Sequence, residues 1–157
     1  MEIRIEFVNI DWNGPFTFED IKAYNGTDDI GVYQVCGYHA AYGRNALLYI
    51  GKTEKQSFGK RLRQERWAEH QAANGDVQIF LGRVLRDKID RVERLLIIAH
   101  LPALNAKDIR NLEETLNNIH VLNWGNRGAL LPEVSGARWS CKSTVNEGVA
   151  SNDTCIE

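Results

Sequence analysis

Residues 30–37 read IGVYQVCG, and residues 45–51 read NALLYIG. Each stretch is rich in aliphatic, β-branched and aromatic residues, a composition typical of a β-strand, and each ends in a glycine. The segment between them is small and polar. The two stretches therefore predict a β-hairpin with a long loop. This hairpin places Tyr33 in one strand and Tyr49 in the other.

Hydrophobic patterns predict the elements around this hairpin. Alternation indicates strands at residues 1–10 and 76–85, and amphipathic patterns indicate helices at residues 58–74, 87–101 and 105–122. A shorter helix is expected to begin after Thr17, which can cap it, and to run to about residue 24. We predict an α/β (mixed α+β) fold. In it the hairpin and residues 76–85 form a small three-stranded antiparallel sheet flanked by helices.

Composition is that of an ordinary globular chain: 157 residues, 43% hydrophobic and 25% charged. This predicts one domain, at residues 1–142, followed by a disordered tail at residues 143–157, which has almost no apolar content. The longest apolar run is too short to span a membrane, and the N-terminus does not resemble a secretory signal. The three cysteines lack metal-ligand spacing. We expect a cytoplasmic protein that does not bind membranes.

The net charge of −2 hides an uneven distribution of charged residues. Residues 31–110 carry fourteen basic and eight acidic side chains, whereas both ends of the chain are acidic. A basic middle can bind a polyanion locally, even though the whole chain is slightly acidic. The alternative is a mixed, solvated surface.

One carboxylate lies beside the apolar stripe of the helix predicted at residues 87–101. Ile89, Val92 and Leu96 mark the buried stripe, and Glu93 lies one turn from Ile89. A carboxylate in this place either forms an ion pair within its helix or binds a hard cation such as Mg²⁺, which takes few protein carboxylates.

An arginine has a comparable place on the helix predicted at residues 58–74. Arg61 lies beside Phe58 and Leu62, which mark the apolar edge of that helix. Its planar guanidinium matches the geometry of a phosphate. Further basic residues extend the positive face and could bind a DNA backbone: Lys60, Arg63 and Arg66. The alternative is a solvated amphipathic helix.

Tyr33 and Tyr49 also have two interpretations. If they lie on adjacent strands and point to one face, their hydroxyls meet near one place. A phenol there can orient a water and take its proton when a cation lowers its pKa. The alternative is two half-buried strand tyrosines that only pack.

The order of these features carries more information than any of them separately. GVY at 31–33, YIG at 49–51, the arginine helix and the glutamate helix that reads VERLLIIAHLPALN follow one another. This order resembles that of the GIY-YIG nuclease family, in a standalone bacterial or phage-type member. The resemblance covers residues 31–105 and implies a GIY-YIG endonuclease-like fold.

The resemblance implies a catalytic role for each matching residue. Tyr33 and Tyr49 match the two motif tyrosines, one of which would activate the attacking water. Arg61 matches the arginine that contacts the scissile phosphate. Glu93 matches the carboxylate that holds one divalent ion, Mg²⁺ or Mn²⁺.

Other matches imply supporting roles. Asn105 matches an asparagine that supports the site or contacts the backbone. Gly31 and Gly51 match glycines that permit close approach. Lys52 directly follows the second motif and could neutralise a phosphate or lower the pKa of a phenol.

The chain also departs from the family pattern. Residues 36–44 form an insertion between the two motifs, and Glu65 stands where many members carry a histidine. His70 or His39 could supply an acid or base instead.

The resemblance predicts a metal-dependent DNA endonuclease whose partner is DNA. A homodimer is one way for such a protein to cut both strands. Affinity would also come from basic residues around the glutamate helix: Arg83, Arg86, Lys88, Arg91 and Arg94. The alternative is a catalytically silent module on the same fold that binds nucleic acid or a protein.

Overall fold

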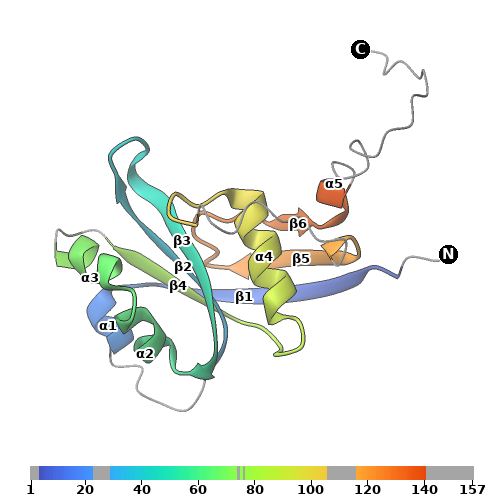
Figure 1. Cartoon of the computed structure of the whole chain (residues 1–157), viewed down its shortest axis with the longest axis horizontal. Helices are drawn as coiled ribbons and strands as arrows, with labels where there is room; N and C mark the ends of the chain where they lie inside the picture. The colour runs from blue at the N-terminus through green and yellow to red at the C-terminus, as the bar shows by residue number, and fades with distance from the viewer. Residues whose placement is uncertain (1–3, 23–28, 74, 76, 106–115, 141–157) are drawn as a thin grey trace.

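A computed structural model gives the fold (Figure 1). It describes residues 4–22, 29–73, 75, 77–105 and 116–140. The expected tail at residues 143–157 lies outside this part. Within the described residues, no helix is long and apolar enough to cross a membrane.

The described residues form one six-stranded sheet in the order β3-β2-β4-β1-β5-β6. Its strands are β1 (Glu6–Phe16), β2 (Asp29–His39), β3 (Gly43–Gln56), β4 (Gln78–Arg83), β5 (Ile119–Gly125) and β6 (Glu133–Ser135). The prediction of a small three-stranded sheet is therefore wrong. The expected strands are adjacent, as β3-β2-β4, but they make up only half of a larger sheet.

Non-local pairing causes the difference. β4 is not an edge strand, because its second edge pairs antiparallel with β1, where Trp12 lies opposite Gly82. The other edge of β1 pairs in parallel with β5, from Glu6 opposite Ile119 onward. β6 then pairs antiparallel with β5. Parallel strands such as β1 and β5 are joined by long connections. The sequence around one of these strands therefore does not show which strand it pairs with.

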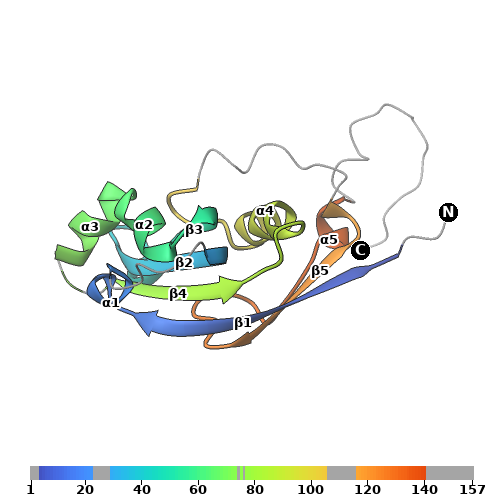
Figure 2. The same cartoon turned by 90° about the horizontal axis from the view of Figure 1, so that it is seen from below.

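Helices cover both faces of the sheet (Figures 1 and 2). They are α1 (Phe18–Lys22), α2 (Phe58–Arg63), α3 (Arg66–Ala73), α4 (Ile89–His100) and α5 (Ala137–Ser140). Figure 1 shows α1, α2 and α3 together at one end, with α4 across the sheet from them. Side chains alternate along β2, so Tyr33 joins the apolar cluster under α1–α3 and Val32 joins the cluster under α4.

Two of the predicted helices differ from the observed structure. The helix expected at residues 58–74 is two helices, α2 and α3, with Gln64 and Glu65 between them. The last residues of the helix expected at 105–122 form a strand, because β5 begins at Ile119. Residues 106–115 lie outside the described part. By contrast, the cap of α1 is as expected: the Thr17 hydroxyl accepts from the Asp20 N–H at 3.1 Å.

His100 connects the end of α4 to the segment before β6. Its Nδ1 lies 2.8 Å from the Leu96 carbonyl oxygen, and its Nε2 accepts from the Leu131 N–H at 2.8 Å. The ring is therefore neutral, with its proton on Nδ1. Burial lowers the pKa of His100 from its ordinary value of 6.5, more than the Leu96 hydrogen bond raises it.

We expect His100 to make stability depend on pH. Its native pKa is lowered, so the unfolded chain binds the proton more tightly. The stability it contributes is therefore present above about pH 6.5 and is lost as the pH falls through the native pKa. Urea unfolding at pH 7.5 and pH 5.5 should show a fall in stability that is smaller in His100→Asn. Equal falls in the two proteins would refute this.

Candidate active site

Tyr33 and Tyr49 share the α2 face of the sheet. Tyr33 lies opposite Gly51 in the β2–β3 ladder, and Tyr49 lies opposite Val35. The two rings have centroids 6.1 Å apart and are tilted by 36°. The two tyrosines thus lie on one face of the sheet, as expected, but Tyr33 is fully buried, so a shared working surface stays a prediction.

Gly51 gives the two rings their space. A Cβ on Gly51 would lie 2.5 Å from the Tyr33 hydroxyl oxygen and 2.8 Å from Tyr49 Cε1. Both are closer than real Cβ contacts allow. Gly31 is confined in the same way, since its Cβ would lie 2.3 Å from the Gly82 carbonyl oxygen. Both motif glycines thus permit close approach within the protein itself.

Gly51→Ala should destabilise the protein by about 1–3 kcal/mol, the usual cost of overpacking a core. The added methyl meets the ring of Tyr33, which is fully buried and has no room to move. Denaturant unfolding measures the effect. In a Tyr33→Leu background the two closest clashing atoms are absent and only Tyr49 Cε1 remains, so the cost of Gly51→Ala should fall. An equal cost in both backgrounds would place the strain elsewhere.

The two tyrosines differ in their environment. Tyr33 is buried, and its hydroxyl has no hydrogen-bond partner within the described residues. Burial raises the pKa of Tyr33 well above its ordinary value of 10.0, and the charge of Arg61 offsets only part of this. Tyr49 is half-buried. Tyr33 is therefore suited to donate a hydrogen bond, and Tyr49 is better placed to meet solvent.

Local capping fixes the helix that carries Arg61. The Ser57 hydroxyl accepts from the Lys60 N–H at 3.2 Å, which caps the N-terminus of α2. The buried Asp29 carboxylate accepts from the Phe58 N–H at 3.0 Å, which ties the same turn to β2. These contacts direct Arg61, one turn further on, toward the end of β3.

Arg61 pairs with a carboxylate that follows its helix. Its Nη1 lies 2.9 Å from Glu65 Oε1, and Glu65 Oε2 accepts from the Trp67 indole N–H at 2.9 Å. Burial lowers the pKa of Arg61, but its interactions with Tyr33, Glu65 and Tyr49 outweigh this effect, so the net shift of the pKa is upward. Arg61 is therefore held as a cation near both phenols.

On the other face of β3, Lys52 meets the acidic side of α4. Lys52 lies opposite Val32, whose side chain belongs to the α4 cluster. Its ammonium contacts Asp90, lies 3.2 Å from Glu54 Oε1 and lies 3.7 Å from Glu93 Oε2. The Glu93 side chain is 20% exposed. Glu93 thus forms an ion pair with Lys52 of β3, whereas the sequence interpretation expected a partner within its own helix.

Arg61 from the α2 side and Lys52 from the α4 side come together at the end of β3. A pocket of about 370 Å³ opens there, lined by Lys52, Thr53, Glu54, Lys55, Gln56, Lys60 and Arg61. Figure 2 shows β3 between α2 and α4. The charges of both Arg61 and Glu93 act on the pKa of Tyr33, so all three groups lie within electrostatic range. Of the five candidate residues, Arg61 and Lys52 line this pocket, whereas Tyr33, Tyr49 and Glu93 are not among its lining residues.

Asn105 stabilises β3 by bonding to the backbone of Ile50. Its Oδ1 accepts from the Ile50 N–H, and its Nδ2 donates to the Ile50 carbonyl oxygen, both at 2.9 Å. Neighbouring N–H groups bond to β3 as well, from Ala103 to Leu47 and from Leu104 to Leu48. The segment after α4 therefore closes the outer edge of β3, next to the second motif.

The structure does not bring His39 to the site. The His39 ring stacks on Tyr42 at 4.8 Å, in the hairpin loop. It lies six residues from Tyr33 along β2, which is ~20 Å. The backbone of His70 lies in α3, and its side chain is outside the described part.

The predicted backbone-binding residues are exposed: Lys60, Arg63 and Arg66. They lie on the same helical layer as Arg61, and Lys60 lines the pocket. Their contact with DNA stays a prediction.

Several cations around α4 have structural contacts. Lys88 and Arg91 each lie 2.7 Å from the Glu6 carboxylate, which ties α4 to β1. Arg86 donates to the Glu54 carbonyl oxygen at 3.0 Å, and Arg83 lies 3.5 Å from Asp29. These contacts give the four cations a structural role. Their contribution to DNA affinity stays a prediction.

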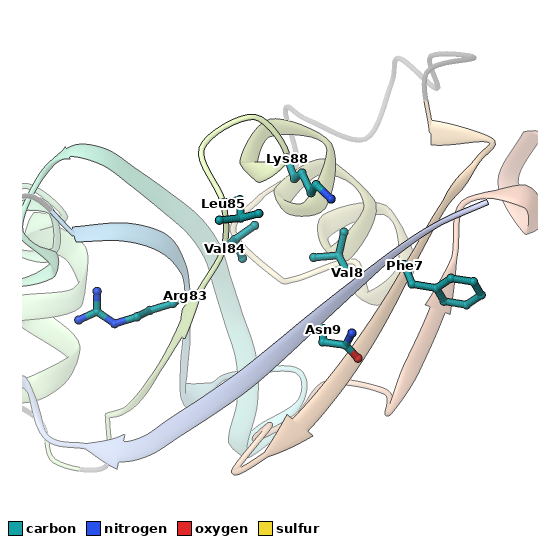
Figure 3. A pocket seen from close by; sticks show the side chains of 7 residues that line it. All are labelled: Phe7, Val8, Asn9, Arg83, Val84, Leu85 and Lys88. Carbon is teal, nitrogen blue, oxygen red and sulfur yellow. The ribbon is translucent and has the colours of Figure 1, made fainter. Parts of the chain in front are cut away.

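A second pocket lies where β1 and the chain after β4 diverge (Figure 3). It measures about 360 Å³ and is lined by Phe7, Val8, Asn9, Arg83, Val84, Leu85 and Lys88. Figure 3 shows Arg83 and Phe7 pointing away from each other, with Val8 and Val84 between them. Its lining is largely apolar, so the pocket at the end of β3 suits an anion better.

Metal-binding potential in the described residues is limited to few donors, since no group of three or more His, Cys, Asp or Glu side chains is arranged to hold an ion. Glu93 remains as an oxygen donor that solvent can reach. Its neighbour Lys52 already places a cation 3.7 Å away. A divalent ion at Glu93 would compete with this ammonium, so metal binding by Glu93 stays a prediction.

Sequence reasoning missed the partner of Arg61. Glu65 entered only as a departure from the family pattern, although its spacing of four residues from Arg61 is a signal for a pair on a helix. Trp67 carried no signal of its own. No protein-family model, curated protein or solved structure matches this chain. The resemblance to the GIY-YIG nucleases thus stays a prediction.

Proposed function

We propose that the protein is a divalent-metal-dependent DNA endonuclease, with its active site at the end of β3. One observation carries the proposal: Arg61 and Lys52 line the same pocket, Lys52 lies 3.7 Å from Glu93, and the rings of Tyr33 and Tyr49 lie on the α2 side of β3. The site thus combines a guanidinium, an ammonium, a phenol and a carboxylate. Hydrolysis of a phosphodiester uses groups of these kinds.

The charge of the pocket supports an anionic substrate. Four cations line it, Lys52, Lys55, Lys60 and Arg61, against one carboxylate, Glu54. Phosphate contacts from such residues give affinity without sequence choice and weaken as salt rises. A phosphodiester of DNA fits this chemistry.

Each residue has a role that follows from its environment. Arg61 would bind the equatorial oxygens of the phosphate and stabilise the charge that builds up there. Tyr49, which is half-buried, would orient the attacking water. Tyr33 would stay protonated and donate a hydrogen bond, because burial raises its pKa.

Glu93 would hold the metal ion. A bound Mg²⁺ or Mn²⁺ supplies Lewis-acid stabilisation of the leaving oxygen. Lys52 lies beside this carboxylate and would limit its negative charge until the ion binds. One site of this kind cuts one strand at a time, so a double-strand break would need a homodimer or a second event.

Conversion of supercoiled plasmid tests the proposal. Purified protein with Mg²⁺ or Mn²⁺ is expected to nick or linearise the plasmid, and EDTA is expected to stop it. Salt-sensitive binding without cleavage, on plasmid and on branched DNA, would instead support the silent binding module. Discrete fragments would indicate sequence selection, and smears would indicate its lack.

A further inference from the structure

Glu65 occupies a junction between three elements of the site. It follows α2 and precedes α3, and its partner Trp67 packs against Tyr49 of β3. Its side chain is only 15% exposed. A carboxylate this shielded needs partners for both oxygens.

Both oxygens of Glu65 have a partner on a different element. Oε1 lies 2.9 Å from Nη1 of Arg61 on α2, and Oε2 accepts from the indole N–H of Trp67 on α3 at 2.9 Å. Trp67 in turn packs edge-on against Tyr49 of β3, with ring centroids 5.6 Å apart. Glu65 thus connects Arg61 to Trp67, which packs against Tyr49.

This connection fixes one side of the guanidinium. Arginine has five N–H donors in a rigid fork. Glu65 contacts Nη1, and Arg61 also lines the pocket at the end of β3. A fork anchored at one corner keeps a fixed direction, and a misplacement of about 1 Å can cost about 100-fold in rate.

We propose that Glu65 is the positioning residue for Arg61, and that it sets the arginine relative to Tyr49 through Trp67. The inference rests on the proposed nuclease function. It differs from an acid–base role, because both carboxylate oxygens are already engaged. Glu65 acts by orienting Arg61 and does not itself touch the phosphate.

Glu65→Gln tests this with little change of shape. A glutamine has one acceptor oxygen and one amide donor, so it can satisfy Arg61 or Trp67 but not both. Single-turnover cleavage should fall about 10-fold or more, whereas DNA affinity should stay equal or rise, since one negative charge beside Arg61 is gone. A simple loss of folding would lower both.

Two further variants sharpen the result. Glu65→Asp keeps both oxygens and should recover part of the cleavage rate that Glu65→Gln loses. Glu19→Gln removes the same charge from exposed α1 and should cleave and bind as the wild type does. A cleavage rate in Glu65→Gln equal to or above that of the wild type would overturn the proposal, because Glu65 would then be irrelevant to Arg61 or restrain it.

A readout without cleavage separates this inference from the proposed function. Hydrogen exchange of the Trp67 indole N–H, followed by NMR, should be faster in Glu65→Ala than in the wild type, because its acceptor is removed. Unchanged exchange would refute the connection even in an active nuclease. Faster exchange in a protein that cuts no DNA would instead leave the connection standing and refute the proposed nuclease.

Discussion

Replacing Glu93 by glutamine is expected to lower DNA cleavage by about 100- to 1,000-fold while leaving DNA binding nearly unchanged. Losing one preorganised group that stabilises transition-state charge typically costs this much in rate. Glutamine keeps the shape of the side chain but lacks the charge that a hard cation needs. Cleavage of a labelled duplex at saturating protein measures the rate, and a filter or anisotropy titration measures binding.

Asp90→Asn is the matched control for Glu93→Gln. Asp90 lies one turn earlier on α4 and contacts the same Lys52 ammonium, yet its side chain is largely exposed. The proposed site gives it no metal, so its variant should cleave at close to the wild-type rate. Equal losses in both variants would mean that the charge around Lys52 matters and that Glu93 holds no ion of its own.

Replacing Asn105 by alanine is expected to destabilise the protein by about 2–4 kcal/mol, because two backbone groups of Ile50 lose their partner at once. An unsatisfied buried donor or acceptor costs about 1–3 kcal/mol. Asn105 is buried, so water does not readily replace its amide. Urea unfolding measures the effect.

Two variants make the Asn105 result specific. Asn13→Ala changes an exposed asparagine of β1 and should shift stability by no more than about 0.5 kcal/mol. Asn105→Asp keeps the acceptor for the Ile50 N–H but loses the donor, so it should also destabilise. A stable Asn105→Ala would show that the edge of β3 does not depend on this amide.

Local signals in the sequence predicted the local elements. The first hairpin strand, the strand near Ile79 and the helix around Val92 lie close to their predicted positions, because each pattern has the period of its own structure. The second hairpin strand, predicted to end at Gly51, continues to Gln56. The Thr17 cap was predictable for the same reason.

The wider sheet depended on partners far apart in the chain. The sequence pattern predicts the stretch IHVL before Asn123 as the end of a helix, yet Ile119, Val121 and Asn123 alternate with less buried residues. The buried amide of Asn123 accepts from the Trp12 indole at 2.9 Å, across 111 positions. No local window contains that contact, so the strand β5 and the six-stranded sheet could not be predicted from periodicity.

The site was predictable in its members but less so in its contacts. Motif order identified Tyr33, Arg61 and Glu93 as candidates. It did not show that Tyr33 is buried or that Arg61 is paired with Glu65, since both depend on how α2 and α3 pack against β3.

The most direct test of the nuclease proposal compares wild type and Glu93→Gln on one labelled duplex, with cleavage and binding measured on the same samples in Mg²⁺ and in EDTA. The proposal predicts cleavage by the wild type in Mg²⁺ alone, and equal binding by a variant that does not cut. Equal cleavage by both proteins, or none by either despite tight binding, would contradict it.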